Sequence, residues 1–438
     1  MGEQKTALIL SIMLLFVLAG SVSISLVGAS SEMWSKTYGN GKEVGNSLVE
    51  TSDGGFAVAG DTGSFGAGGS DFWLVKTDSN GNMEWNRTYG GAEDESAKAV
   101  IKTSDGGFAM AGNRNPYEYS ECDCWFVKTD SYGNMEWNQT YGGPDYDCAN
   151  ALIETSDGGY AIAGGTLSFG AGETDFWLVK TDAQGNMKWN QTYGGADAET
   201  STSLVETHDG GYALAGGRTG LEGGVPGFYP FDNTIWLVKT DVYGNMEWNQ
   251  TYGERLSYKN AHSLVATSDG GFAMGGYVPD GHYSDFWLIK TDSKGDMEWS
   301  KSFGRGGDEK AYSMVQTSDG GYALAGIASG AIGTEAYLDS WMVKTDADGN
   351  EIWRQTYAET GDQYIYSLVE TSDDAFALAG WKTYTSTGPP YLWIIKTDEY
   401  GYIPEFPSWT ILPLLLAATA LIVVCRKRLT KHNRILGA

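Results

Sequence analysis

The sequence predicts an all-β fold, a seven-bladed β-propeller whose blades are four-stranded antiparallel sheets. The first observation is a motif, Thr-Ser-Asp-Gly-Gly followed by an aromatic residue and Ala, that recurs about every 50 to 60 residues, a period typical of propellers and solenoids. Six copies begin at Thr51, Thr103, Thr155, Thr207 (where His replaces Ser), Thr267 and Thr317, and a degraded seventh begins at Thr371. The second observation is that four strand patterns recur in every repeat, and the third is an extra strand pattern at the N-terminus.

The third repeat shows the four strands, which we name A to D: 151–155, 160–164, 175–182 and 187–193. Asp-Gly and Gly-Asn dipeptides join A to B and C to D, and such dipeptides supply the positive φ angles of tight hairpins. The C strand is apolar on both faces, as in Phe-Trp-Leu-Val at 176–179. This pattern indicates a sheet packed between two neighbouring sheets.

The number of D strands predicts that the ring closes. Their Trp residues are Trp34, Trp85, Trp137, Trp189, Trp248, Trp299 and Trp353. The first D strand (33–38) therefore precedes any A strand, whereas the last C strand (391–398) has no good D strand after it. Pairing these two removes exposed sheet edges, and an open solenoid is the alternative. The predicted repeats are 47–89, 99–141, 151–193, 203–252, 263–303, 313–357, and 367–398 combined with 33–38.

The strand order with a Trp on the D strand resembles the PQQ-type propeller repeat. The Ser-Asp-Gly-Gly-Tyr and Val-Lys-Thr-Asp-x-x-Gly-Asn elements are similar to those of prokaryotic surface propellers. The resemblance covers about residues 33–400. It implies the fold, and it leaves the activity open because propellers carry unrelated functions.

The two ends of the chain predict export and membrane anchoring. Residues 1–29 read as a signal peptide, with an apolar stretch that ends in Val-Gly-Ala. The propeller follows at 30–402. An apolar run at 409–425 and a basic tail at 426–438 read as a transmembrane helix and a cytoplasmic tail. We therefore expect a cell-surface protein with its N-terminus outside.

A short motif lies just before the apolar run. Pro404, Glu405 and Phe406, within the linker 403–408, resemble the PEF-CTERM sorting signal of archaeal surface proteins, the substrates of archaeosortases. The resemblance implies that the span is removed and replaced by a lipid anchor. An ordinary single-pass anchor is the alternative.

The charge of the chain limits the classes of partner that it can bind. The net charge of −27 excludes nucleic acid as a partner, because binding to phosphates requires a basic surface. Four sequons repeat at one place on the D strands, and we expect either glycosylation or a strand role for their asparagines, Asn86, Asn138, Asn190 and Asn249.

Three cysteines fall close together in the repeat pattern. Because an exported protein permits disulfides, we expect Cys122 or Cys124 to pair with Cys148. A metal site is the alternative, and no His accompanies the group.

The face formed by the B/C loops and D/A links is the predicted binding face, because it varies among the repeats. Its aromatic residues could stack on sugars or contact a partner protein: Phe65, Tyr117, Tyr119, Phe169, Phe228, Tyr229, Phe231, Tyr283, Tyr337, Trp381 and Tyr384. The links carry acids that are candidate ligands for Ca²⁺, with solvated loop carboxylates as the alternative: Glu43, Asp94, Asp145, Asp197, Glu254, Asp308 and Asp362. No other cofactor is expected.

Motifs for catalysis are missing from the sequence. It contains no nucleophile elbow, phosphate loop or zinc-type spacing. The predicted function is a non-enzymatic surface binding or adhesion module for an extracellular glycan or envelope protein. The alternatives are a structural spacer of the envelope and, less favoured, a carbohydrate-active or quinoprotein-like enzyme.

Overall fold

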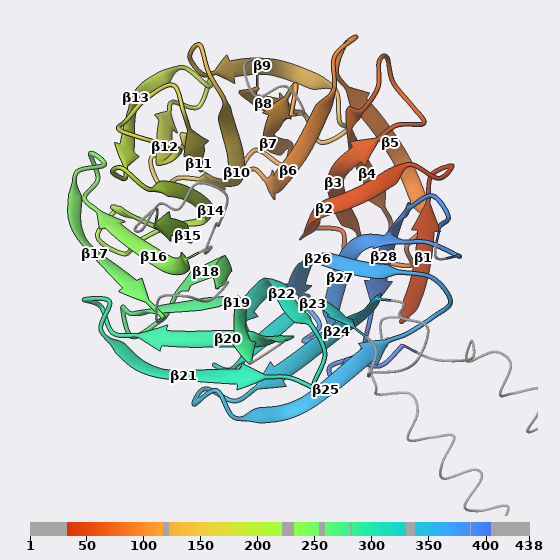
Figure 1. Cartoon of the computed structure of the whole chain (residues 1–438). Helices are drawn as coiled ribbons and strands as arrows, with labels where there is room; N and C mark the ends of the chain where they lie inside the picture. Colours follow the sequence, from red (N-terminus) through yellow and green to blue (C-terminus); the bar gives the residue numbers. More distant parts are fainter. Residues whose placement is uncertain are drawn as a thin grey trace, which may run out of the picture. The chain divides into compact units, whose positions relative to one another are not determined.

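The protein is described here by a computed structural model that covers residues 33–116, 122–220, 232–253, 259–280, 283–329, 338–385 and 387–403. Within these residues, seven four-stranded antiparallel sheets surround a common axis (Figure 1). The A strands lie nearest the axis and the D strands lie at the rim. The predicted seven-bladed propeller is therefore confirmed.

Each blade runs from its inner to its outer strand in chain order. Blade 1 is β2 (Glu43–Glu50), β3 (Phe56–Thr62), β4 (Asp71–Thr77) and β5 (Met83–Tyr89); blade 2 is β6 (Glu95–Lys102), β7 (Phe108–Arg114), β8 (Asp123–Thr129) and β9 (Met135–Tyr141); blade 3 is β10 (Asp147–Glu154), β11 (Tyr160–Thr166), β12 (Asp175–Thr181) and β13 (Met187–Tyr193); blade 4 is β14 (Ala198–Glu206), β15 (Tyr212–Gly220), β16 (Asp232–Thr240) and β17 (Met246–Tyr252). Blade 5 is β18 (Asn260–Ala266), β19 (Phe272–Asp280), β20 (Tyr283–Thr291) and β21 (Met297–Phe303); blade 6 is β22 (Glu309–Gln316), β23 (Tyr322–Ser329), β24 (Leu338–Thr345) and β25 (Glu351–Tyr357); blade 7 is β26 (Gln363–Glu370), β27 (Phe376–Lys382), β28 (Tyr391–Lys396) and β1 (Trp34–Tyr38).

The seventh blade is closed by the N-terminal strand, as predicted. Strand β1 pairs antiparallel with β28, with Trp34 opposite Lys396 and Tyr38 opposite Leu392. The two ends of the propeller chain therefore share one sheet, and this pairing supplies the seventh blade with its outer strand.

The core lies between the blades. Neighbouring residues of one strand point into different clusters: Phe72 and Leu74 pack against blade 2, whereas Trp73 and Val75 pack against blade 7. This alternation explains why the C strands are apolar on both faces. Each sheet is buried because it has two neighbours.

The A strands begin about four residues earlier than the sequence pattern indicated. Strand β10, for example, starts at Asp147 rather than at residue 151. Its register against β11 shifts between Ala149 and Ala151. This β-bulge breaks the two-residue alternation on which strand prediction depends, so the pattern covered only the second half of the strand.

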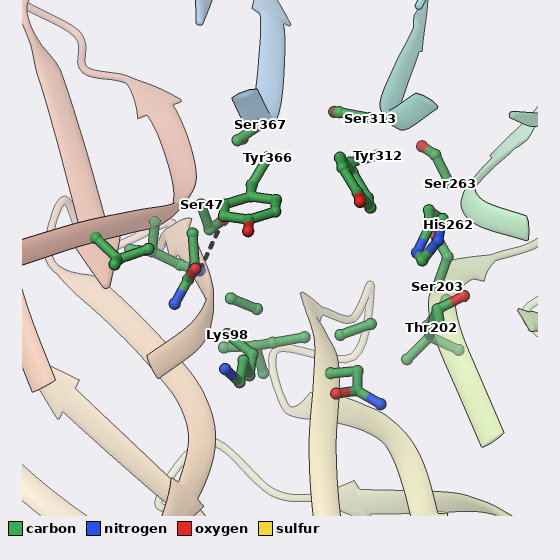
Figure 2. A pocket seen from close by; sticks show the side chains of 18 of the residues that line it. Ser47, Lys98, Thr202, Ser203, His262, Ser263, Tyr312, Ser313, Tyr366 and Ser367 are labelled. Carbon is green, nitrogen blue, oxygen red and sulfur yellow. Dashed lines mark hydrogen bonds between the residues drawn. The ribbon is translucent and has the colours of Figure 1, made fainter. Parts of the chain in front are cut away.

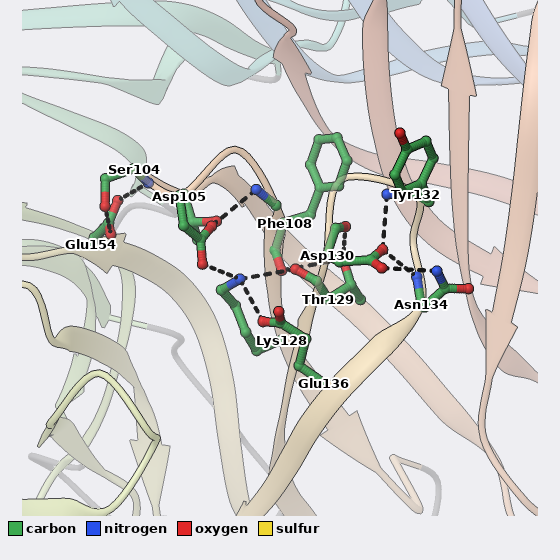
Figure 3. A network of polar contacts seen from close by, with 12 residues as sticks. Ser104, Asp105, Phe108, Lys128, Thr129, Asp130, Tyr132, Asn134, Glu136 and Glu154 are labelled. Atoms are coloured by element: carbon green, nitrogen blue, oxygen red, sulfur yellow. Dashed lines mark hydrogen bonds and ion pairs between the residues drawn. The ribbon is translucent and has the colours of Figure 1, made fainter.

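The repeated Lys and Asp of the motif form a structural clasp at each blade (Figure 3). In blade 2, the ammonium of Lys128 is almost fully buried and pairs with Asp105 at 2.9 Å and with Glu136 at 3.0 Å. Burial of Asp105 acts to raise its pKa, but the bonds from Thr103 and Lys128 outweigh it and lower the pKa to about 2. The buried lysine is tolerated because its charge is paired.

The C/D turns join each blade to the one before it. The turn glycine Gly185 has φ +76°, and a Cβ there would lie 2.6 Å from the ring of Trp137 on the preceding blade. Tyr141 of that blade donates its hydroxyl to the carbonyl of Gly185. Glycine is required at this position by both the backbone conformation and the close approach of the indole.

Two substitutions separate these two requirements. Gly158, in the A/B turn of the same blade, has nearly the same φ of +77°, but no neighbouring atom lies within 4 Å of the place that a Cβ would take. We expect Gly158→Ala to cost about 1 kcal/mol of unfolding free energy through backbone strain alone. Gly185→Ala should cost about 2 kcal/mol more, because Trp137 must move. Urea denaturation of both variants measures the difference, and equal losses would contradict the packing role of the indole.

Candidate functional site

The seven β-bulges place one residue of every A strand in the central channel. The register shift skips the same position in each strand, and all seven skipped residues line one pocket. We call them the bulge ring: Asn46, Lys98, Asn150, Thr202, His262, Tyr312 and Tyr366. A bulge turns a side chain away from the ladder, so these residues reach the channel from strands that are otherwise alike.

The pocket has a volume of about 710 Å³, which is within the range of small-molecule sites. Beyond the bulge ring it is lined by the serines that follow in the A strands and by Asp61 and Trp381 from B strands. Figure 2 shows Tyr366, Tyr312 and His262 in a row along one side of the pocket, with Lys98 across from them. The two sides therefore differ in chemistry.

One side, from blades 5 to 7, is aromatic. The rings of Tyr312 and Tyr366 meet edge to face at 5.2 Å, and Tyr312 meets His262 in the same way at 5.1 Å. Trp381 stacks on Tyr364 at 4.2 Å and donates its indole N–H to the Tyr366 hydroxyl at 3.4 Å. Burial lowers the pKa of His262 to about 4, so this imidazole is neutral at pH 7.

The other side, from blades 1 to 4, carries polar bulge-ring side chains, and we call it the polar side. The aliphatic residues of the lining also lie on these blades: Val44, Ala99, Val100, Ala151, Leu152 and Leu204. Asn46 and Asn150 each donate to a backbone carbonyl of the next blade, Ala97 at 2.7 Å and Ser201 at 2.9 Å. These bonds fix the amides in place and also link the blades. Thr202 does the same with the carbonyl of Ala261.

Asp61 contributes a carboxylate to the polar side. Its Oδ2 accepts from the Ser96 hydroxyl at 3.0 Å, and its buried Oδ1 has no hydrogen-bond partner in the described structure. Burial raises the pKa of Asp61, and the nearby Lys98 and Ser96 oppose that shift. The channel thus holds one acid and one ammonium group on its polar side.

Serines next to the bulge ring hold the channel wall together. Ser47, Ser203, Ser313 and Ser367 each accept from a backbone amide of the next blade, at 3.0 to 3.1 Å. Ser263 donates to the carbonyl of Met314. The wall is therefore built before any ligand binds.

The predicted aromatic residues of the B/C loops do not gather into one site among the described residues. Phe65 and Phe169 each stack on the C-strand Trp of their own blade, Trp73 and Trp177, and each is 38% exposed. Tyr384 packs on Tyr391 and is half exposed. Trp381 is the member that lines the channel pocket, and Tyr283 lies in β20. Tyr117, Tyr119, Phe228, Tyr229, Phe231 and Tyr337 lie outside the described residues.

The predicted acidic residues have local structural partners. Asp94, Asp308 and Asp362 accept from backbone amides of the preceding B/C loops, those of Ser70, Ser284 and Leu338. Three further members differ: Glu43 is buried and accepts from three link amides, Asp197 pairs with Arg218, and Asp145 is exposed. The described part of the chain contains no group of three or more His, Cys, Asp or Glu residues placed to hold a metal, and Glu254 lies outside it.

Buried acids do meet in pairs at several blade boundaries, which the sequence pattern did not reveal. Asp71 of blade 1 and Glu95 of blade 2 both lie against Gly90, where a Cβ would clash with either carboxylate. Asp175 and Glu199 share Gly194 in the same way. Burial raises the pKa of Asp71 and of Glu95, and repulsion from neighbouring acids adds to both shifts.

The three cysteines are buried free thiols in the structure, so the predicted bridge from Cys122 or Cys124 to Cys148 is not formed there. Burial raises the pKa of the Cys122 thiol to about 12, which leaves little reactive thiolate at neutral pH. The sulfur of Cys148 accepts from the amide of Gly165 at 3.2 Å.

The sequon asparagines have a strand role. Each accepts the indole N–H of the C-strand Trp of its own blade at 3.1 to 3.2 Å; the four pairs are Asn86 with Trp73, Asn138 with Trp125, Asn190 with Trp177 and Asn249 with Trp236. Glycosylation of these residues stays a prediction. The predicted signal peptide, the Pro404–Phe406 motif and the predicted span lie outside the described residues, within which no helix has the length and apolar character of a bilayer span.

The bulge ring is the feature that sequence reasoning missed. The residues on either side of it repeat closely, as Gly-Asn-Ser, Ala-His-Ser and Ala-Tyr-Ser show, while the middle residue changes. The position two residues earlier in the A strands is more variable still, with a different residue in each of the seven copies, so variation alone would not have found the bulge ring.

Comparison with known proteins supports the fold and leaves the family open. No family model matches the chain. The regulatory protein FlaEY of Caulobacter vibrioides is 25% identical over 238 residues, which cover 48% of this chain and 24% of FlaEY. The chain therefore spans about a quarter of the length of that curated relative.

Solved structures of similar fold have little sequence identity. A point mutant of puromycin hydrolase complexed with PGG has a TM-score of 0.51 at 10% identity, covering 82% of this chain and 52% of that one. The Pan2 WD40 domain of Neurospora crassa has a TM-score of 0.47 at 10% identity and covers 82% and 97%. YCF48 bound to D1 peptide has a TM-score of 0.48 at 11% identity and covers 85% and 97%. These likenesses concern the fold alone.

The paired acids predict a pH dependence of stability. An acid with a raised folded pKa binds protons more tightly in the folded state, so its contribution to stability falls as pH rises through that pKa. We expect Asp71→Asn to stabilise the protein at pH 7 by about 1 kcal/mol, with the gain shrinking as pH falls toward 4. Thermal unfolding across this pH range measures it.

Asp53→Asn is the matched control. Burial acts to raise the pKa of Asp53, but the bond from Lys76 and other hydrogen bonds lower it to about 2. Its stabilising effect is therefore present at neutral pH and disappears as pH falls toward 2. The control should destabilise the protein at pH 7, and a gain of stability there in both variants would contradict the assignment.

Proposed function

We propose that the chain is a non-enzymatic binding module, exported and tethered at the cell surface, that takes its ligand in the central channel. The observation that carries the proposal is the bulge ring, in which seven equivalent strands present seven channel-lining positions filled by five residue types. The two positions that flank the ring are filled mostly by Gly, Ala or Ser, so the strand itself does not require this variety of polar and aromatic groups in the channel. A ligand with different groups around its edge would require it.

The channel is built for binding without rearrangement. Asn46, Asn150 and Thr202 are oriented by bonds to the next blade, and the serines beside them bond backbone groups. A site whose side chains are fixed in advance loses little conformational entropy when it binds a ligand. The ligand reaches it from the face of the B/C loops and D/A links, where Trp381 lies near the start of its loop.

The geometry favours binding over catalysis. His262 lies among aromatic rings and is neutral, while Ser263 next to it donates to a backbone carbonyl. This arrangement differs from a nucleophile held by a general base. The remaining alternative, an envelope spacer, has no need for an asymmetric channel.

The location rests on the ends of the sequence. The apolar N-terminal stretch, the Pro404–Phe406 motif and the apolar run with its basic tail support export and anchoring. Processing by an archaeosortase belongs to the same proposal, as does an extracellular glycan or envelope protein as the bound partner.

Two aromatic substitutions test whether the channel or the loops bind. The propeller, residues 33–403, closes its own ring and can be screened against an array that carries glycans and extracellular peptides. We expect Tyr366→Ala to weaken saturable binding at least about tenfold, because it removes a ring from the pocket wall. Phe65→Ala, which removes an exposed ring from a B/C loop, should leave binding unchanged.

Other results would contradict the proposal in defined ways. Loss of binding in Phe65→Ala alone would move the site to the loops. Absence of saturable binding by the unmodified propeller would favour the spacer, and turnover of an array component would show an enzyme.

A further inference from the structure

The charges of the channel point to the class of ligand. Asp61 and Lys98 are the acid and the ammonium group of the pocket lining among the described residues, and they oppose each other in sign. The remaining polar groups are the amides of Asn46 and Asn150, hydroxyl groups and a neutral imidazole. The pocket as a whole is therefore close to neutral, although the chain carries a net charge of −27.

The polar side offers both donors and acceptors at fixed positions. An Asn side chain can make four hydrogen bonds. The Nδ2 of Asn150 donates to the carbonyl of Ser201 and to the sulfur of Cys148, which orients the amide and leaves its oxygen available. Asp61 adds a carboxyl group to the lining, and Lys98 adds up to three N–H donors. Alternating donors and acceptors suit hydroxyl groups, each of which both donates and accepts.

The aromatic side offers ring surface opposite these groups. Tyr312 and Tyr366 are each partly exposed and meet edge to face, so their planes differ by 64°. Two rings at such an angle cannot both pack flat on each other, and so some ring surface remains for a ligand. An apolar face on one side and hydrogen-bonding groups on the other is the division that a sugar ring presents.

The enclosure of the pocket limits how a ligand enters. Seven A strands surround it, joined to one another by the bonds of Ser47, Ser203, Ser313 and Ser367. A long polymer cannot lie across a site that strands surround around its whole circumference. It can enter by its end.

We propose that the channel binds the terminal ring of a neutral glycan, with the ring against Tyr312 and Tyr366 and its hydroxyls toward Asn46, Asp61 and Lys98. This inference rests on the proposed function and specifies its ligand. Because the ligand carries no charge, binding should depend little on salt.

The test uses an array of neutral oligosaccharides in which each sugar stands both at a free chain end and inside a longer chain. The array also carries carboxylated sugars and charged peptides, which are the alternative classes of ligand. For the sugar that binds, titration calorimetry then compares the unmodified propeller with Tyr312→Ala, Tyr312→Phe and Lys98→Gln, whose melting temperatures establish that they fold.

We expect binding to the free-end form, with an affinity that changes little between low and high salt. Tyr312→Ala should lose at least about tenfold in affinity, since stacking surface is removed, whereas Tyr312→Phe should keep most of it. Lys98→Gln should weaken binding by a smaller factor without changing its salt dependence.

Three outcomes would overturn the inference. Equal binding of internal sugars would rule out entry by the chain end. If the channel binds peptides or carboxylated sugars instead of neutral sugars, the inferred ligand class is wrong, and the proposed binding function is retained. If Tyr366→Ala abolishes the binding of no component of the array, the proposed function is contradicted as well.

Discussion

The contact between neighbouring blades is the interaction on which the whole structure depends. A single blade has apolar side chains on both faces, as Phe72 and Trp73 show by pointing into different clusters. Neither face can be buried within the blade itself. Each sheet is therefore stable only between two others, and the last blade must meet the first. The pairing of β1 with β28 satisfies this requirement by joining the two ends of the propeller chain in one sheet.

The repeated residues serve the blade and its contacts rather than a ligand. The clasp of Lys128 with Asp105 and Glu136 lies within one blade, whereas the turn glycine Gly185 receives the indole of the preceding blade. These residues recur because the same blade and the same boundary between blades recur. Functional chemistry must then come from positions that the boundary does not constrain, and the bulge ring is such a set.

Much of the fold could be predicted because short stretches of sequence determine it. Turn motifs, apolar alternation and the extra N-terminal strand were enough for the number of blades and for their closure. The site was harder to predict because it depends on an irregularity. A bulge adds one residue to one strand, so Asn46 or His262 breaks the alternation of polar and apolar residues. The sequence pattern therefore places the start of the strand after this residue. The acid pair Asp71 and Glu95 was missed for another reason, since its members come from different repeats and meet only across a blade boundary.

The bulge has a consequence for how such a protein changes over generations. A residue that lies outside the ladder register and outside the apolar clusters between blades is not fixed by strand pairing or by apolar packing, even where, as with Asn46, it also bonds the next blade. When repeats of this kind are duplicated, each new copy brings one free position into the channel along with the full set of residues that build the blade. The chain can thus acquire a new specificity one side chain at a time, while selection for a closed ring keeps the turns and the residues packed between the blades alike.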